Sequence, residues 1–396
     1  MYMNVIIAIC VLILIAYVFD LTSSLTKIPS VILLLILGWG VRQATNFLGY
    51  NFTELSTVLP ILGTVGLILI VLEGALELEL NKSKVKLVTK SFFGAIFPIL
   101  AIAFSLVYIF HETGSTSNRL NLLNAIPLCI ISSAIAIPTV RNLNKNIREY
   151  VVYESSMSDI IGVILFNYIA MNEYINSDSI STFLLQLSGM IAISLISTLG
   201  LSFLLSKIDH HIKFIPIILL IILIYAIAKT YHLPALLFIL ILGLSLGNLD
   251  ELRRFKWLKI FHTEELDTEI KKFKELTVEA TFLIRTMFFI LFGYLIETKD
   301  LMNLDTLPLA LLITVFIFMF RAVQLKLSGL AFSPLLFIAP RGLITILLFL
   351  SIEPSQRIST VNNSLIIQVI ILTAITMMLG IMFCRKSENV TEANQP

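Results

Sequence analysis

The sequence predicts an all-α polytopic membrane protein with about 13 transmembrane helices, two of them interrupted. Two observations predict this fold class. Of the 396 residues, 57% are hydrophobic and 14% are charged, whereas about a quarter of the residues in a soluble domain are charged. Apolar runs of about 20 residues, the length that crosses the hydrocarbon core of a bilayer, recur along the whole chain.

Thirteen candidate spans follow one another and form a single integral membrane domain over residues 1–396. They lie near residues 3–23, 28–46, 57–79, 91–111, 122–141, 153–173, 181–205, 214–231, 232–249, 278–297, 306–325, 331–352 and 362–384. His232 and Pro234 separate the eighth span from the ninth, because the combined run is too long for one helix.

The Lys and Arg residues are divided unequally between alternate loops. Of the 28, 20 fall in one set of loops, five in the other set, and three, Arg285, Arg321 and Arg341, within spans. Because basic residues accumulate in cytoplasmic loops, we expect an outside N-terminus and a cytoplasmic C-terminus. Residues 385–396 would then form a short cytoplasmic tail of a protein in the plasma or inner membrane. The net charge of +2 reflects this topology and predicts no nucleic-acid partner.

Cysteine and histidine are too scattered to predict a disulfide framework or a metal centre. The three cysteines lie in or at the ends of apolar spans, so we expect no disulfides and no cofactor. The five histidines lie at span ends or in loops. An intramembrane hydrolase needs a Ser–His or Asp–Asp pair within the bilayer, so the sequence argues against an enzyme. A receptor or a structural scaffold stays open at this point.

The stretch YESSMSDIIGVILF at 153–166 places carboxylates at the start of an apolar span. Ionisable residues inside a membrane are costly and mark functional sites. Asp159 lies six residues into its predicted span, or about 9 Å at 1.5 Å per residue. Ser155 lies one turn earlier on the same helical face, and Ser158 adjoins it. A carboxylate and hydroxyls at one depth are hard oxygen ligands, suited to a small cation.

Glu154 projects from a different face of the same helix, about 140° from Asp159 at 100° per residue. It lies near the cytoplasmic beginning of its span, and Arg321 lies near the cytoplasmic end of another. Opposite charges at matching depth are expected to pair, since either alone would be costly. We therefore expect a structural ion pair; the alternative is that each side chain reaches the headgroups independently.

Two further ionisable residues lie within spans, and the sequence leaves their roles open. Glu73 is flanked by LIVL and GAL, so its carboxylate has no short route to the headgroups. Arg285 is about seven residues into its span and could reach the cytoplasmic headgroups.

Helix-breaking residues interrupt two spans in mid-membrane. Span 122–141 contains SSAIAIP, which includes Ser132 and Ser133. Span 331–352 contains SPLLFIAPRG, which includes Arg341. Discontinuous helices in corresponding positions of two halves indicate a transporter site, and the opposite directions of these spans suit an inverted repeat. Ser132 and Ser133 would lie at the crossing, where Arg341 would offset the negative C-terminal ends of the half-helices.

Together these residues resemble the monovalent cation:proton antiporters, and within them the sodium/proton exchangers of the NhaP type. The most specific match is ESSMSD at 154–159, which is similar to the family's Glu-Ser-Leu-Leu-Asn-Asp motif. The other matching stretches follow in the same order over nearly the whole chain: LGTVGLILIVLEGALELEL at 62–80, RTMFFILFGYLIE at 285–297, MFRAV at 319–323 and PRGLITILL at 340–348. The resemblance implies an inverted-repeat antiporter fold with two crossed discontinuous helices.

The resemblance also implies roles for individual residues. Asp159 would be the carboxylate that binds the ion and the proton, with Ser155 as a ligand, so that sodium would bind at these two residues. Glu154 would pair with Arg321, and Glu73 is similar to a further ligand in some members.

Two positions depart from the family's pattern. The residue before the essential aspartate is usually Asn and here is Ser158, which we keep among the ion-binding residues. The usual Thr-Asp-Pro at the first helix break is replaced by SSAIAIP, so Ser132 and Ser133 would stand in for it.

The sequence thus predicts a secondary active antiporter that exchanges sodium, and also lithium, for protons by alternating access around Asp159, in pH homeostasis. A single exchanging carboxylate predicts an electroneutral cycle. The alternatives are a potassium/proton antiporter and a sodium-coupled organic anion symporter of related fold. Core helices at about 91–173 and 306–384 would move against scaffold and dimer helices at about 3–79 and 181–297. The expected partners are alkali cations, protons, the lipid bilayer and, by resemblance, a second copy of the chain.

Overall fold

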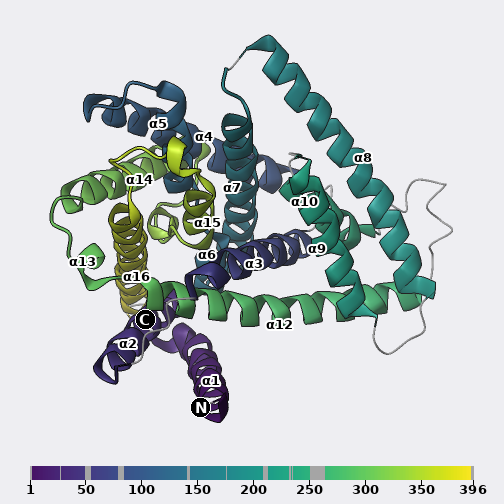
Figure 1. Ribbon diagram of the computed structural model, residues 1–396, viewed down its shortest axis with the longest axis horizontal. Helices are drawn as coiled ribbons and strands as arrows, with labels where there is room; N and C mark the ends of the chain where they lie inside the picture. Colours follow the sequence, from purple (N-terminus) through teal and green to yellow (C-terminus); the bar gives the residue numbers. More distant parts are fainter. Residues whose placement is uncertain are drawn as a thin grey trace.

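The computed structural model describes residues 2–26, 28–49, 55–78, 84–140, 143–174, 176–207, 213–231, 233, 235–249 and 264–393. The regular elements among these residues are all helices (Figure 1). They are α1 (Tyr2–Thr26), α2 (Ser30–Phe47), α3 (Leu55–Glu77), α4 (Val85–Glu112), α5 (Asn118–Cys129), α6 (Ser133–Thr139), α7 (Lys145–Met171), α8 (Ser177–Lys207), α9 (Phe214–Thr230), α10 (Ala235–Gly247), α12 (Glu264–Leu295), α13 (Thr298–Leu301), α14 (Leu307–Ser328), η3 (Leu335–Phe337), α15 (Leu343–Ser351), η4 (Pro354–Gln356) and α16 (Asn363–Ala393).

Each of the thirteen predicted spans contains a helix, which confirms the predicted fold class. Within the described ranges, nine helical stretches are long and apolar enough to cross a membrane. The shorter apolar helices α9 and α10 account for the eighth and ninth spans. His232 and Pro234, on which that division rests, lie outside the described residues. Helix α16 runs to Ala393, through most of the predicted tail.

Helix α7 begins eight residues earlier than its predicted span, at Lys145 rather than Tyr153. The side chain of Asn144 caps it by accepting a hydrogen bond from the Asn146 N–H at 3.2 Å, which satisfies one of the free amides of the first turn. Asp159 therefore lies about 21 Å from the start of its helix at 1.5 Å per residue. The depth of about 9 Å is counted from the start of the apolar span at Tyr153 and stays a prediction. Hydropathy marks where a run becomes apolar, whereas the cap decides where the helix begins.

Both predicted interruptions are real breaks in helices. Helix α5 ends at Cys129 and α6 begins at Ser133, with extended backbone between them. The second interruption lies between η3 and α15. The two breaks meet, because the Ser132 N–H donates a hydrogen bond to the Pro340 carbonyl at 2.9 Å. Backbone groups that have lost their helical partners are thus satisfied across the crossing.

The two breaks occupy equivalent places in two three-part units. The first unit runs α4, the broken pair α5/α6, then α7; the second runs α14, the broken pair η3/α15, then α16. Helix α4 packs against α5, α7 and α14, and α14 packs against α16, so the two units form one bundle. The site lies where the two broken pairs cross inside this bundle.

A second group of helices packs beside that bundle. Helix α12, the long helix along the lower side of Figure 1, packs against α2 and α3, and α10 packs against α3 and α8. The α2–α12 contact depends on glycine: a Cβ added to Gly38 would lie 2.1 Å from the Ile290 carbonyl oxygen. A Cβ added to Gly293 would lie 2.4 Å from the Leu35 carbonyl oxygen. Small residues allow such close backbone approach between membrane helices.

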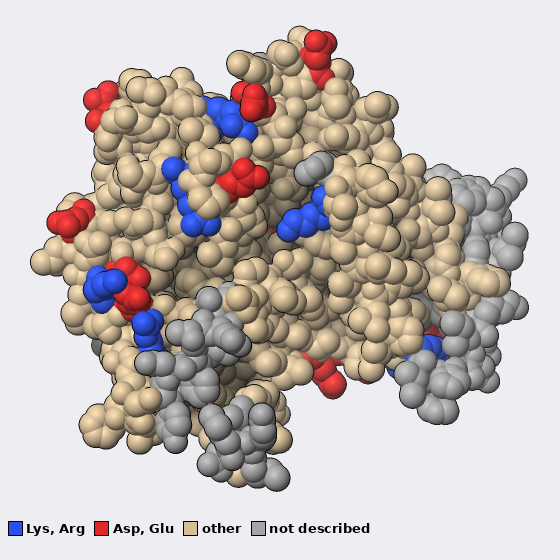
Figure 2. All heavy atoms as spheres, viewed as in Figure 1, with Lys and Arg blue, Asp and Glu red and all other residues tan. Residues whose placement is uncertain are grey.

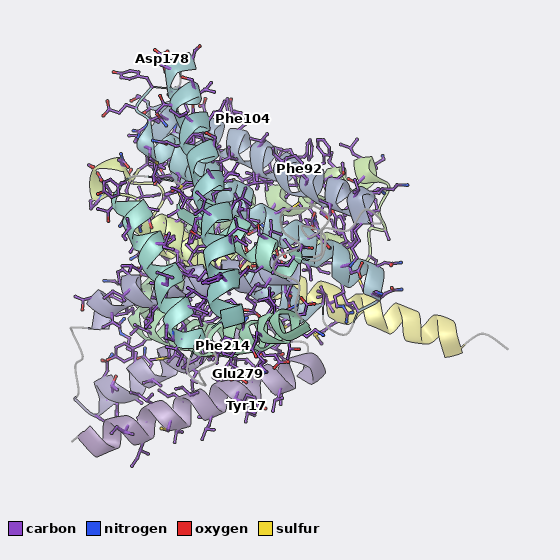
Figure 3. The ribbon with its side chains drawn as sticks, turned by 90° about the vertical axis from the view of Figure 1, so that its right-hand side faces the viewer. Tyr17, Phe92, Phe104, Asp178, Phe214 and Glu279 are labelled. Carbon is purple, nitrogen blue, oxygen red and sulfur yellow. The ribbon has the colours of Figure 1, made fainter. Side chains whose placement is uncertain are left out.

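The outer surface carries many exposed apolar side chains. Figure 2 shows few Lys, Arg, Asp or Glu side chains on the visible face, which is hollowed near its middle. Large apolar side chains project outward, among them Phe104 and Phe92 of α4 and Tyr17 of α1 (Figure 3). Such a surface is compatible with contact with lipid tails.

Candidate functional site

Asp159 lies at the crossing of the broken helices, near the middle of α7. Its carboxylate is almost fully buried, at 3% exposure. One carboxylate oxygen, Oδ2, accepts a hydrogen bond from the Ser133 hydroxyl and a second from the Ser133 N–H at 3.3 Å. Ser133 is the first residue of α6, so its N–H has no partner within the helix. The break in the first discontinuous helix therefore supplies the donors that hold Asp159.

The other carboxylate oxygen, Asp159 Oδ1, has no hydrogen-bond partner among the described residues. A buried polar atom without a partner is costly, so such an atom at a crossing of broken helices suits a ligand. Within the described part of the chain, no group of three or more His, Cys, Asp or Glu residues lies close enough to hold a metal ion. Asp159 thus offers one carboxylate oxygen to a ligand, and the polar groups around it are hydroxyls and backbone groups.

The two serines of α7 that the sequence singled out make different contacts. The Ser158 oxygen accepts a hydrogen bond from the Ile131 N–H at 2.9 Å, in the extended segment between α5 and α6. Ser158 therefore holds the break beside Asp159. The Ser155 hydroxyl donates to the Val151 carbonyl at 2.7 Å, one turn back along its own helix. The structure brings Ser133 to Asp159, whereas the bond described for Ser155 stays within α7.

Arg341 ties the two breaks together from the second discontinuous helix. Its guanidinium donates to the Leu128 carbonyl at 2.8 Å, the Cys129 carbonyl at 3.1 Å and the Ala339 carbonyl at 3.0 Å. Leu128 and Cys129 are the last residues of α5, where helix carbonyls have no intrahelical partners and carry partial negative charge. The charge of Arg341, which is 1% exposed, faces these carbonyls.

Ser132 contributes its backbone to the crossing. Its N–H bonds to Pro340, while its hydroxyl is buried without a described partner. A Cβ added to Gly342 would lie 2.8 Å from that hydroxyl oxygen. Glycine at position 342 therefore allows the two breaks to approach closely.

Glu154 and Arg321 form an ion pair between α7 and α14, with both side chains 1% exposed. Two residues that sequence reasoning missed complete this cluster. The Tyr150 hydroxyl donates to Glu154 at 2.7 Å, and the Gln324 amide donates to the Tyr150 oxygen at 3.0 Å. Both could have been found by spacing, because Tyr150 lies one turn before Glu154 and Gln324 lies one turn after Arg321.

Glu73 lies near the C-terminal end of α3, in the second group of helices, and is half-buried. Its neighbour Gly74 faces the ESSMSD segment of α7, since a Cβ on Gly74 would lie 3.3 Å from the Ser156 hydroxyl. Arg285 is buried within α12, at 9% exposure. The roles of Glu73 and Arg285 stay open.

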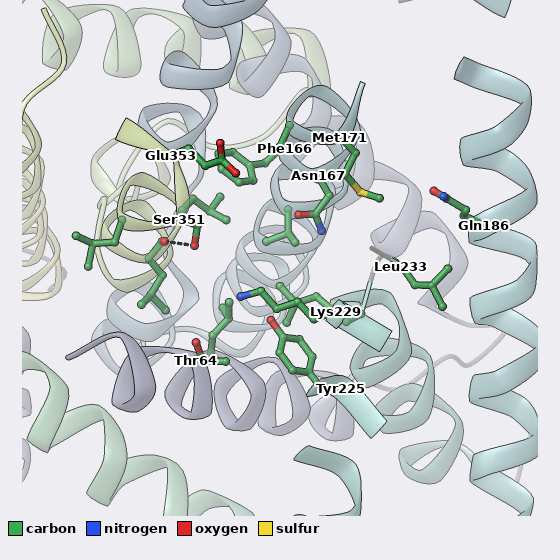
Figure 4. Close-up of a pocket in the computed structure, with 18 of the residues that line it drawn as sticks. Thr64, Phe166, Asn167, Met171, Gln186, Tyr225, Lys229, Leu233, Ser351 and Glu353 are labelled. Carbon is green, nitrogen blue, oxygen red and sulfur yellow. Dashed lines mark hydrogen bonds between the residues drawn. The ribbon is translucent and has the colours of Figure 1, made fainter. Parts of the chain in front are cut away.

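A wide cavity of about 940 Å³ separates the bundle of the crossing from the second group of helices (Figure 4). The end of α7 and the α15–η4 segment form one wall, and α3, α8, α9 and α10 form the other. A much smaller cavity, of about 10 Å³, is lined by Asp159 and by three residues that also line the wide cavity, Val163, Asn167 and Leu236. Asn167 was not among the predicted site residues, although a lone amide in an apolar run is a signal that the sequence contains.

Comparison with known proteins identifies a family and structures of similar fold. The family described as "Sodium/hydrogen exchanger, transmembrane" matches residues 9–384. The fold is similar to a structure of the sodium proton antiporter MjNhaP1 from Methanocaldococcus jannaschii at pH 8, with a TM-score of 0.70 and 18% identity over 96% of each chain. An electron-microscopy structure of MjNhaP1 has a TM-score of 0.67 and 19% identity, over 97% of this chain and 95% of that one. No curated protein matches the sequence.

Proposed function

Because the chain belongs to the sodium/hydrogen exchanger family and is therefore a cation/proton antiporter, we propose that it exchanges sodium, and also lithium, for protons at Asp159. The observation that carries this proposal is the state of the Asp159 carboxylate. Ser133 holds one oxygen, and no described residue bonds to the other. Asp159 lines a small cavity that shares three residues with the wide one.

A single carboxylate is sufficient for exchange. When Asp159 is ionised, its free oxygen can bind a cation; when it is protonated, the charge that attracts the cation is gone. The cation and the proton therefore compete for one site. Moving an empty, charged carboxylate through the membrane interior is costly, and this cost suppresses uncoupled leak of either ion.

The neighbouring residues keep this carboxylate in place while its ligand changes. Ser158 holds the extended backbone of the first break, and Arg341 binds the last carbonyls of α5. Glu154 and Arg321 compensate each other's charge in their ion pair. We propose that Ser155 and Glu73 add oxygen ligands when the cation is bound.

The exchange is proposed to be electroneutral, with one proton for one monovalent cation. Ser158, before Asp159, carries no ionisable group, and an arginine such as Arg321 does not deprotonate in proteins. Glu154 is engaged with Arg321. Asp159 is then the exchanging group, and Glu73 is the residue that would change the count if it took up a proton in step with Asp159.

The packing suggests which parts move. Helices within about 91–173 and 306–384 contain the crossing and are proposed as the mobile core. Those within about 3–79 and 181–297 are proposed as the scaffold and, in a homodimer, the interface. The wide cavity lies between the two groups. With the N-terminus outside and the C-terminus in the cytoplasm, it would open to the outside of the cell membrane, as expected of an exchanger in pH homeostasis.

Reconstitution into vesicles tests this function directly. A pH gradient is imposed and lithium, sodium and potassium are added in turn, with no organic solute present. Collapse of the gradient by sodium and lithium supports the proposal. Collapse by potassium alone would indicate a potassium/proton antiporter, and no collapse until an organic anion is added would indicate the symporter alternative.

The variant Asp159→Asn tests the assignment of the site. It keeps the size of the side chain but removes the charge, so cation-dependent proton release should be lost while the protein elutes and melts like the parent. Asp178→Asn makes the same change at an exposed position of α8 and should exchange normally. Near-normal exchange by Asp159→Asn would overturn the assignment.

A further inference from the structure

Asn167 is the polar residue among the three that line both cavities. It lines both the wide cavity of about 940 Å³ and the small one of about 10 Å³ that reaches Asp159. The other residues around the small cavity are apolar: Val71, Ile160, Val163, Ile164, Leu236 and Leu237. A cation passing from the wide cavity to Asp159 therefore meets one amide in an otherwise apolar passage.

The position of Asn167 follows from the helix that carries Asp159. Both residues lie on α7, and eight residues correspond to about two turns, or about 12 Å. Figure 4 shows the carboxamide of Asn167 directed into the wide cavity. Its side chain makes no hydrogen bond to another described residue. Asp159 also lines the small cavity, and its Oδ1 atom has no hydrogen-bond partner among the described residues. Two residues that line the small cavity thus carry oxygens available to a ligand.

The volume of the small cavity limits what can pass through it. A space of about 10 Å³ holds about one water molecule, far less than the hydration shell of an alkali cation. The ion must therefore shed most of its water before it reaches Asp159. Carbonyl oxygens can replace the hydration shell of a cation in a narrow passage, and the amide of Asn167 supplies such an oxygen at the side of the wide cavity.

We propose that Asn167 is a specificity-determining residue: its carboxamide oxygen is the first protein ligand of an alkali cation that moves from the wide cavity to Asp159. This inference rests on the proposed exchange at Asp159. A ligand along the path lowers the barrier to loading and leaves the affinity of the final site unchanged. Its influence is greatest for lithium and smallest for potassium, because the smaller ion holds its water more strongly.

Two substitutions at Asn167 and one matched control test this role in reconstituted protein. Asn167→Leu replaces the amide by an apolar group of similar size, and Asn167→Ser keeps an oxygen. Gln186→Leu removes an amide that lines the wide cavity but not the small one. Asn167→Leu should lower the maximal exchange rate about tenfold for sodium, since a hydrogen-bonding or ligand group is lost without replacement. The loss of rate in Asn167→Leu should be larger for lithium and smaller for potassium. Asn167→Ser should recover most of the exchange rate. The rate of Gln186→Leu should stay within about twofold of the parent.

A binding measurement separates this role from a structural one. The rise in melting temperature with cation concentration reports equilibrium affinity in detergent, and it should be the same for the parent and Asn167→Leu. An equal loss of rate for all three cations, a lower equilibrium affinity, or a rate like that of Gln186→Leu would each overturn the inference and leave exchange at Asp159 intact. Absence of cation-driven proton flux in the parent would overturn the proposed function, and the role of Asn167 with it.

Discussion

Removal of Glu154 should destabilise the protein far more than removal of a neighbouring glutamate on the same helix. In Glu154→Ala the guanidinium of Arg321, 1% exposed, loses its carboxylate and keeps a hydrogen bond to the Leu335 carbonyl at 3.1 Å. Breaking one side of a buried ion pair costs about 3–5 kcal/mol, because the remaining charge stays buried without compensation. The Tyr150 hydroxyl also loses its acceptor.

Glu149→Ala is the matched control. Glu149 pairs with Lys84 at 3.5 Å, but the two side chains are 25% and 23% exposed. A solvent-accessible pair contributes about 0–1 kcal/mol, so the same substitution five residues earlier in α7 should be nearly silent.

Thermal unfolding of both variants in detergent, followed by loss of the monodisperse elution peak after heating, measures the difference. The double variant Glu154→Ala/Arg321→Ala should be more stable than Glu154→Ala alone, since it removes the uncompensated charge. Equal melting of Glu154→Ala and Glu149→Ala would refute the reasoning, because it would mean that Arg321 finds water or another partner when Glu154 is absent.

Three further outcomes are expected. Ser133→Ala removes the hydroxyl that holds Asp159 Oδ2, so the apparent cation KM should change several-fold while folding is retained; an unchanged KM would contradict this role. Gly38→Val places a side chain where a single Cβ would already lie 2.1 Å from the Ile290 carbonyl oxygen, so folded yield should fall sharply, whereas Gly40→Val, with open space around position 40, should express normally. With ionic gradients clamped, an imposed membrane potential should leave the exchange rate of the parent unaltered, and a transport current would show a second moving charge, with Glu73 as the first candidate.

Membrane spans were predictable because the bilayer imposes their length and composition. An apolar run of about 20 residues has few alternatives to a helix where no water can satisfy the backbone. Each of the thirteen predicted spans contains a helix for this reason. The starts of the helices were less predictable: the cap at Asn144 extends α7 through charged residues that hydropathy alone assigns to a loop.

Residues at the candidate site were recognisable from the sequence wherever the cost of burial made them conspicuous. Charges such as Asp159, Glu154 and Arg321 stand out in apolar runs because a membrane tolerates them only where they are used. Helix breaks beside them stand out because the freed backbone groups need partners. These features are local, so they can be recognised in the sequence before the fold is known.

Partners across helices were decided by the tertiary structure alone. Helical periodicity places Ser155 on the face of Asp159, but the hydroxyl that reaches Asp159 belongs to Ser133 of α6. Periodicity describes one helix, whereas a hydrogen bond depends on how two helices approach and in what register. The role inferred for Asn167 depends on two cavities that exist only between packed helices. The sequence by itself determined the membrane fold and the charged residues inside it, and the packing of the broken helices decided which groups face one another.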